Sequence, residues 1–227
     1  MSNFPIPLPA RSTAQWLPLV ILITSFACGA RGQIFTDWTS IDGTNSIVSG
    51  TLGSTTVTFT STTAGNIYTT WLNGTYTGFA IAAFTPALGT SDALEFIGNP
   101  SSPNYTITFG VPVLNPILQF ASAGSTLTVS GATPNFVSGD SRLSVNGNQV
   151  IGADFNGNPS PNNDANGTIQ FPGTFSSLTF TAFWSGGTDG IDLQIGATAI
   201  PEPAVEAALL GVAAFGLVLA RRRHRTI

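Results

Sequence analysis

The feature that most constrains the fold is an alternation of apolar residues with threonine or serine, which recurs along residues 33–199. Residues 56–60, 105–109 and 126–130 all alternate in this way. Successive side chains of a strand point to opposite faces, so a period of two predicts strands with one buried face. The same range lacks a sustained period of 3.6 residues among good helix formers. The sequence therefore predicts an all-β domain.

Later segments of the same range are expected to supply more of the core. Their apolar residues are Phe171, Phe175, Leu178, Phe180, Phe183, Ile191, Leu193 and Ile195. Turn signals separate the apolar segments, at Asp42-Gly43, Asn73-Gly74, Asn146-Gly147, Asn156-Gly157, Asn166-Gly167 and Gly186-Gly187. Asn-Gly and Asp-Gly pairs favour tight hairpins, because both central residues of such a turn need positive φ. We expect about ten to thirteen strands in a jelly-roll-like two-sheet sandwich.

Residues 1–32 have the order of a secretory signal peptide. Arg11 precedes an apolar run that begins at Trp16, and small residues follow up to Gly32, near which cleavage is expected. The apolar run is too short to cross about 30 Å of hydrocarbon. Lipidation of Cys28 is an alternative, although Ser25 stands where a lipoprotein signal prefers leucine.

Residues 200–227 contain three parts in order. The tripeptide Pro201-Glu202-Pro203 comes first. An apolar run at residues 207–220 follows, which would make a helix about 21 Å long, or about 26 Å if the helix starts at Ala204; this helix is short but can span a membrane. The basic cluster Arg221, Arg222, Arg223, His224 and Arg225 comes last. Arginines stay on the cytoplasmic side of a membrane, and prolines keep the preceding segment extended. We expect a single transmembrane helix with an exposed segment before it.

This order of Pro-Glu-Pro, apolar helix and arginine cluster resembles the PEP-CTERM sorting signal. The resemblance covers about 28 residues, with all three parts in register. It implies recognition by exosortase, an integral-membrane enzyme similar to cysteine proteases, in Gram-negative bacteria that make exopolysaccharide. The implied route is export, a transient anchor in the inner membrane, and then the cell surface or the extracellular space. Residues Pro201, Glu202, Pro203, Arg221, Arg222 and Arg223 would then be recognised as substrate.

A second, looser resemblance lies inside the β-rich range. A strand followed by Val111-Pro112-Val113-Leu114-Asn115-Pro116, with a later Gly173-Thr174-Phe175, is similar to domains attached to PEP-CTERM signals. This resemblance implies a surface β-domain and carries no known catalytic residues.

The inventory of titratable groups excludes several functions. Residues 33–199 contain no histidine, cysteine or lysine, which rules out catalytic triads, Schiff bases and ordinary zinc sites. Nine acidic residues against Arg142 give a balance of −8, which would repel nucleic acid. Glu95 lies three positions after Asp92, so a strand would point the two carboxylates to opposite faces. We therefore expect no enzyme; a polysaccharide-cleaving enzyme with an aspartate pair is the third hypothesis.

One loop is rich in oxygen donors of the kind that calcium prefers. The candidate ligands are Asp154, Asn156, Asn158 and Asp164. Pro159 replaces the glycine that an EF-hand requires, and no glutamate closes the loop, so an EF-hand is excluded. The alternatives are a structural calcium ion and a turn that uses Asn and Asp for their backbone tolerance.

Aromatic residues offer a platform for sugars. The candidates are Trp38, Trp71 and Trp184, with Tyr68 and Tyr76, and the alternative is that they fill the core. The leading hypothesis is therefore an exported structural or adhesive surface protein, and the alternative is a module that binds exopolysaccharide. No cofactor is expected apart from the calcium ion.

Overall fold

The alternating segments form strands, as predicted. The computed structural model describes residues 32–153 and 164–198, together with Gly211, Val212, Ala214 and Gly216. The strands are β1 (Gln33–Phe35), β2 (Asp37–Asp42), β3 (Ile47–Leu52), β4 (Thr55–Ser61), β5 (Ile67–Tyr76), β6 (Ser91–Gly98), β7 (Asn104–Ala123), β8 (Thr126–Ser130), β9 (Asn135–Gly139), β10 (Leu143–Asn146), β11 (Gln149–Gly152), β12 (Ala165–Gln170), β13 (Thr174–Phe183) and β14 (Asp189–Thr198). Every pairing between them is antiparallel. The all-β prediction is confirmed.

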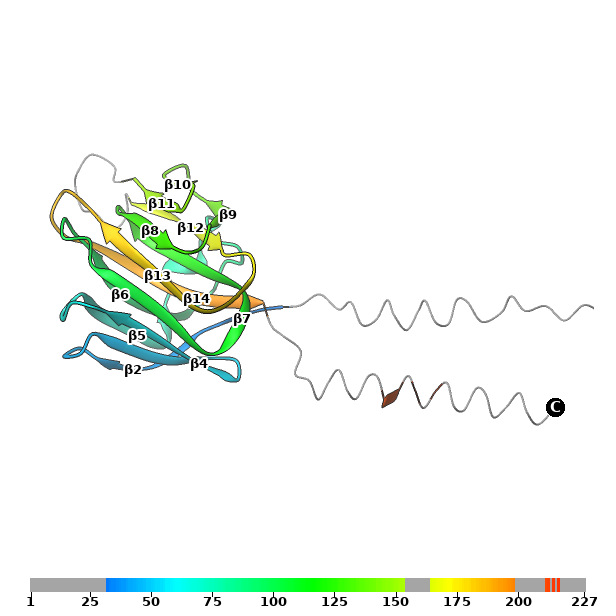
Figure 1. The fold of residues 1–227 in the computed structure, drawn as a ribbon. Helices are drawn as coiled ribbons and strands as arrows, with labels where there is room; N and C mark the ends of the chain where they lie inside the picture. Colours follow the sequence, from blue (N-terminus) through cyan, green and yellow to red (C-terminus); the bar gives the residue numbers. More distant parts are fainter. Residues whose placement is uncertain (1–31, 154–163, 199–210, 213, 215, 217–227) are drawn as a thin grey trace, which may run out of the picture. The chain divides into compact units, whose positions relative to one another are not determined.

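The long strand β7 joins two sets of strands into a sandwich-like fold (Figure 1). Its first part lies between β4 and β13, and its later part lies between β12 and β14. The first layer therefore runs β2-β3-β4-β7-β13-β8-β11-β10, and the second runs β9-β12-β7-β14-β6-β5, with β1 beside the end of β14. Asn115, with a φ of 48°, lies where β7 passes from one set to the other.

The core lies between these two layers. Phe59, Tyr105 and Phe180 come from the first layer and meet Phe96 of the second. The ring centroids of Phe59 and Tyr105 lie 5.4 Å apart, and those of Phe96 and Tyr105 lie 4.8 Å apart. The Tyr105 hydroxyl donates a 2.6 Å hydrogen bond to the Ile97 carbonyl, which satisfies the polar end of a buried ring.

Most of the predicted core residues are buried, with two differences on β13. Ile191, Leu193 and Ile195 are fully buried on one face of β14, as the alternation predicts. Phe183, however, is 46 % exposed, and that prediction is wrong. Leu178, Phe180 and Ala182 hold the inward positions of β13, so residue 183 has to point outward. Phe175 is half-buried.

Three of the predicted turns join strands, and two lie inside them. Asp42-Gly43, Asn146-Gly147 and Gly186-Gly187 follow β2, β10 and β13. Asn73-Gly74 instead forms an irregularity within β5, where the register shifts and both residues have positive φ. Asn166-Gly167 lies within β12. The glycine is needed there for close packing against β9, since a Cβ on residue 167 would stand 2.4 Å from the Ser138 carbonyl oxygen. Asn156-Gly157 lies outside the described residues.

The expected signal peptide and sorting signal fall on residues that the structure does not describe, apart from four positions in the C-terminal apolar run. Within the described part of the chain, no helix has the length and hydropathy that a membrane span requires. Residues Gly32–Ile200 cluster as one compact unit.

Replacing Phe59 by alanine should destabilise the domain by about 3–5 kcal/mol, because the ring is fully buried against three other aromatic rings. Urea unfolding of residues 33–199, followed by circular dichroism, measures the change. Phe183→Ala is the matched control, with an expected change within about 0.5 kcal/mol because that ring is exposed. Equal losses in the two variants would contradict the assigned core.

Candidate functional site

Two carboxyl groups lie side by side on the outer face of the second layer. Glu95 on β6 and Asp192 on β14 are directly opposite each other in the register of these strands. Directly opposite residues have Cβ atoms about 4.5–5.5 Å apart and point to the same face. Glu95 also lies over Gly190, where an added Cβ would collide with its Oε1. The fold thus pairs Glu95 with a carboxyl group far away in the sequence.

Tyr76, from the end of β5, covers this acid pair. Its hydroxyl donates a short hydrogen bond to Oδ2 of Asp192. The Tyr76 ring packs against Trp71 and Phe79, with centroids 4.9 Å and 4.8 Å away. The acid pair is therefore shielded by aromatic side chains along one side.

This environment changes the proton affinities of the three groups. Burial raises the pKa of Asp192 to about 7, and the charge of Glu95 acts in the same direction while the Tyr76 hydrogen bond opposes both. Burial also raises the pKa of Glu95 and that of Tyr76. The charged form of a carboxyl group is disfavoured by loss of water and by a like charge nearby. Asp192 therefore titrates near neutral pH.

A strap at residues 77–90 covers the sheet next to the acid pair. It begins with the short 3₁₀ helix η1 (Gly78–Ala80). Phe79 and Phe84 of the strap pack against Ala93 and Ala121 and form a second, smaller apolar cluster. Side chains of the sheet hold the strap's backbone: Thr168 Oγ1 accepts from Thr85 N at 2.9 Å, Gln119 Nε2 donates to Pro86 O at 2.7 Å, and Ser138 Oγ donates to Ala83 O at 2.9 Å.

Asp92, by contrast, lies away from this pair. It is buried, and its carboxylate accepts hydrogen bonds from the backbone N–H groups of Trp38 and Gly74, at 2.8 Å and 2.5 Å. The carboxylate thus connects β2, β6 and the irregular part of β5. The structure agrees with the expectation that Asp92 and Glu95 do not form a pair.

The prediction that Trp38 binds sugar is wrong. Its side chain is only 1 % exposed and belongs to the main core. The β2 backbone is held to buried Asp92, which fixes the indole on the inward side of the layer. A ring in that position has no face to offer to a ligand.

Trp71 and Trp184 are half-buried and lie in different surroundings. Trp71 packs on Tyr76 with an interplanar angle of 50°, so the two rings do not form a flat platform. The Trp184 ring lies over Gly186 in its own turn, where an added Cβ would stand 2.5 Å from the indole. Tyr68 is 60 % exposed. Sugar binding by Trp71 and Trp184 stays a prediction.

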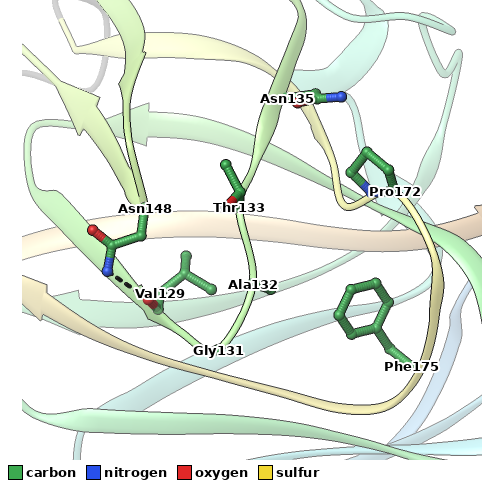
Figure 2. Close-up of a pocket in the computed structure, with 8 residues that line it drawn as sticks. All are labelled: Val129, Gly131, Ala132, Thr133, Asn135, Asn148, Pro172 and Phe175. Atoms are coloured by element: carbon green, nitrogen blue, oxygen red, sulfur yellow. Dashed lines mark hydrogen bonds between the residues drawn. The ribbon is translucent and has the colours of Figure 1, made fainter.

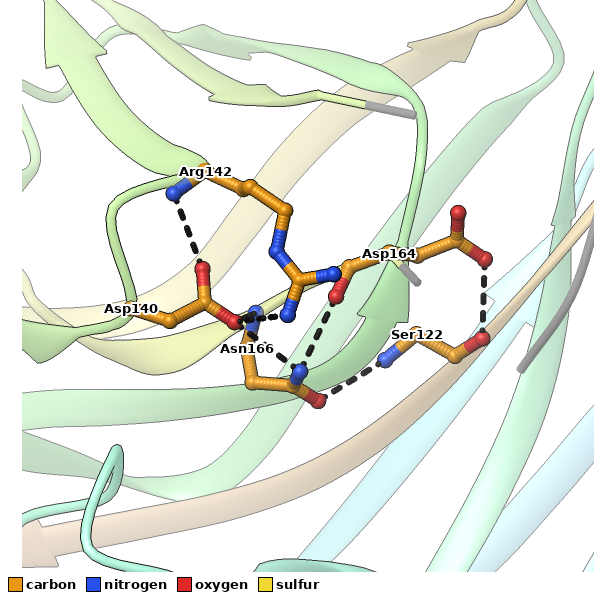
Figure 3. A network of polar contacts seen from close by, with 5 residues as sticks. All are labelled: Ser122, Asp140, Arg142, Asp164 and Asn166. Atoms are coloured by element: carbon orange, nitrogen blue, oxygen red, sulfur yellow. Dashed lines mark hydrogen bonds and ion pairs between the residues drawn. The ribbon is translucent and has the colours of Figure 1, made fainter. Parts of the chain in front are cut away.

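One member of the predicted calcium site belongs to a polar network at the start of β12 (Figure 3). Oδ2 of Asp164 accepts from the Ser122 hydroxyl at 3.2 Å, and its carbonyl accepts from the Asn166 amide at 2.9 Å. The same amide donates to Asp140, which also forms a 2.8 Å ion pair with Arg142. Burial opposes ionisation of Asp140, but the bonds from Arg142 and Asn166 and the arginine charge lower its pKa.

The other predicted ligands, Asp154, Asn156 and Asn158, lie outside the described residues. Among the residues that are described, no three His, Cys, Asp or Glu side chains come close enough to hold a metal ion. The network of Figure 3 fixes the point at which the donor-rich loop rejoins the sheet. Calcium binding by that loop stays a prediction.

A surface pocket of about 580 Å³ lies between the connection from β8 to β9 and the turn before β13 (Figure 2). Phe175 stands across the pocket from Gly131 and Ala132, and Asn148 lies at its other end, hydrogen-bonded to the Val129 carbonyl at 2.8 Å. The volume lies within the range of about 300–1,000 Å³ that is usual for small-molecule sites.

No family model, curated protein or solved structure matches the chain.

Two features escaped the sequence analysis. The pair Glu95 and Asp192 depends on the register between β6 and β14, which no local pattern reveals. The pocket depends on three connections that lie apart in the sequence, β8 to β9, β10 to β11 and β12 to β13, although its Phe175 was already part of the Gly173-Thr174-Phe175 pattern. The one sequence signal for the pocket was the pattern Gly173-Thr174-Phe175, which directly follows Pro172.

The stability of residues 33–199 should fall as the pH rises from about 4 to about 7. The unfolded chain releases the Asp192 proton near the ordinary pKa of 3.8, whereas the folded protein retains it up to about 7. The stabilisation is therefore complete below the lower value and lost above the higher one. Asp192→Asn keeps an oxygen for the Tyr76 hydroxyl without the charge, so its melting temperature should fall less between pH 5 and pH 8.

Asp42→Asn is the control for this titration. Asp42 is exposed, and hydrogen bonds from Asn45 lower its pKa, so it stays charged over the same range. Thermal unfolding of the three proteins at several pH values gives the comparison. A wild-type melting temperature that rises between pH 5 and pH 8 would refute the assigned protonation of Asp192.

Proposed function

We propose that this chain is an exported bacterial surface protein that exosortase sorts and cuts, and that its β-domain acts as a structural or adhesive module without turnover. One observation carries the proposal: Pro201-Glu202-Pro203, an apolar run and the cluster from Arg221 to Arg225 follow one another in this order within 25 residues. Each part alone is common, whereas the ordered set resembles the PEP-CTERM signal.

The proposal assigns a role to each part of the chain. Residues 1–32 are a signal peptide, and residues 204–220 are a transmembrane helix that anchors the protein in the inner membrane until it is cut. The arginine cluster stops transfer, because a guanidinium group in the middle of a membrane costs about 2.5–3.5 kcal/mol on the translocon scale. The mature domain is a jelly-roll sandwich at the cell surface or in the extracellular matrix, and β7, which contributes to both layers, is consistent with that topology.

The chemistry of the β-domain supports a role without turnover. Residues 33–199 lack histidine, cysteine and lysine, so these three types of nucleophile and base are missing from the sequence itself. The acid pair is engaged internally, since Asp192 accepts from Tyr76 and Glu95 lies over Gly190. The hydrogen bond between Tyr76 and Asp192 can serve to hold the end of β5 and the strap against the sheet.

Polysaccharide cleavage has one observation in its favour. Glu95 and Asp192 face the same side on neighbouring strands, and glycoside hydrolysis usually requires a pair of carboxyl groups. If the domain is an enzyme, it should release reducing ends from a polysaccharide, and Glu95→Gln and Asp192→Asn should each abolish the release. We expect no release from the wild type or from either variant. If the wild type releases reducing ends and both substitutions abolish the release, the domain is an enzyme and the proposal of a structural role fails.

Exchange of Glu202 and Pro203 for alanine should block processing in the native host. The helix would still insert, but the recognition element would be gone, so uncut precursor should accumulate in the inner-membrane fraction. Immunoblots of fractionated cells and mass spectrometry of the surface protein measure the outcome.

Glu206→Ala is the matched control, because it removes a nearby acidic residue outside the tripeptide and should leave processing intact. If the wild-type protein at the cell surface still ends at Ile227, the C-terminal segment is a permanent anchor and the sorting proposal fails.

A further inference from the structure

We infer that the pocket of Figure 2 is a binding site for an uncharged polysaccharide segment, with the ring of Phe175 as its stacking surface. The inference rests on the proposed function, because it names the ligand class of a surface module. It moves the expected sugar contact away from the three tryptophans, onto residues that the sequence analysis did not assign to sugar.

The lining of the pocket matches the chemistry of a neutral sugar. A pyranose ring presents C–H groups on its faces and hydroxyl groups around its edge, so it needs an apolar surface beside neutral hydrogen-bonding groups. The pocket offers both, and it is lined by Val129, Gly131, Ala132, Thr133, Asn135, Asn148, Pro172 and Phe175. Phe175 and Pro172 supply the apolar side, and the exposed Thr133, Asn135 and Asn148 supply hydroxyl and amide groups.

Charge excludes other common ligands. None of the eight lining residues is charged, so a phosphate or carboxylate would find no counter-ion there. Residues 33–199 carry nine acidic side chains and one arginine, a balance of −8, which would repel an anionic glycan before contact. A volume of about 580 Å³ is also much larger than a single ion needs. A neutral polysaccharide meets none of these barriers.

The wall that carries Phe175 is held in place before any ligand arrives. Asn115 and Gly173 exchange two hydrogen bonds: Asn115 N donates to Gly173 O at 2.7 Å, and Gly173 N donates to Asn115 Oδ1 at 2.9 Å. Phe171 N donates to Pro116 O at 2.9 Å, and the Phe171 and Phe175 rings meet edge to face at 6.4 Å. The two patterns singled out in the sequence, Asn115-Pro116 and Gly173-Thr174-Phe175, therefore form one contact that positions the ring.

The opposite end of the pocket is equally constrained. Asn148 bridges the β10–β11 hairpin to β8, because its carbonyl accepts from Val129 N at 2.9 Å while its Nδ2 donates to Val129 O at 2.8 Å. Val129 itself is buried in the main core. A site whose walls are already ordered loses less conformational entropy on binding, which helps a ligand that makes only a few contacts.

The test uses the full chain, purified in a detergent without a sugar headgroup. Isothermal titration with hexasaccharides of cellulose, xylan and dextran supplies neutral probes, and a hexasaccharide of alginate supplies the anionic one. We expect at least one neutral probe to bind with a Kd of about 1 mM or tighter, and the alginate probe not to bind. Phe175→Ala should weaken binding at least tenfold.

Phe183→Ala is the matched control, since it removes the same side chain from an exposed position of the same strand, outside the pocket. Should Phe175→Ala fail to fold, Thr133→Val with Asn135→Ala removes polar groups from exposed positions and should also weaken binding at least tenfold. The inference is overturned if no neutral probe binds the wild type, if both of these variants bind as tightly as the wild type, or if Phe183→Ala loses as much as Phe175→Ala.

This experiment separates the site from the sorting proposal. A chain that binds a neutral hexasaccharide but keeps its C-terminus at Ile227 on the cell surface would retain the site and refute the sorting. A chain that is cut and released but binds none of the probes would retain the sorting and refute the site.

Discussion

The arrangement of the domain depends on the pairing of β7 with four other strands. Hydrogen bonds to β4 and β13 hold its first part, and bonds to β12 and β14 hold its later part. Buried backbone groups must be paired, and β7 has hydrogen-bonded partners on both sides along most of its length. Its pairing therefore fixes the positions of strands in both layers. The transition at Asn115 then serves a second purpose, since the same residue holds the turn at Gly173 and with it one wall of the pocket.

The two faces of the second layer have different chemistry. Its inner face gives Leu94, Phe96 and Leu193 to the main core, whereas its outer face carries Glu95, Asp192 and the sites that anchor the strap. A strand alternates its side chains, so apolar and acidic residues can follow one another without conflict. The acidic positions are nevertheless partly desolvated, because Tyr76 and the strap cover them, and this raises their pKa values.

A surface module without charged ligand contacts suits the composition of the chain. Charged residues make up only 8 % of the sequence, and polar positions are filled mainly by threonine, serine, asparagine and glycine. Hydroxyl and amide groups bind sugars by hydrogen bonds that do not depend on ionic strength, in contrast to salt bridges. The uncharged lining of the pocket and the acidic balance of the domain therefore fit the proposed contact with neutral polysaccharide.

The sequence by itself determined the all-β class, because a period of two is a local property that each strand displays. The sequence also shows that residues 33–199 lack the histidine, cysteine and lysine that catalytic triads and Schiff bases need. It shows as well the C-terminal order of Pro-Glu-Pro, apolar run and arginine cluster. Only the tertiary structure decided that Trp38 is buried, that Asn166-Gly167 lies inside a strand, and that Glu95 meets Asp192. These outcomes depend on register and on contacts between strands far apart in the chain, and a slip of one residue would reverse the face of every side chain.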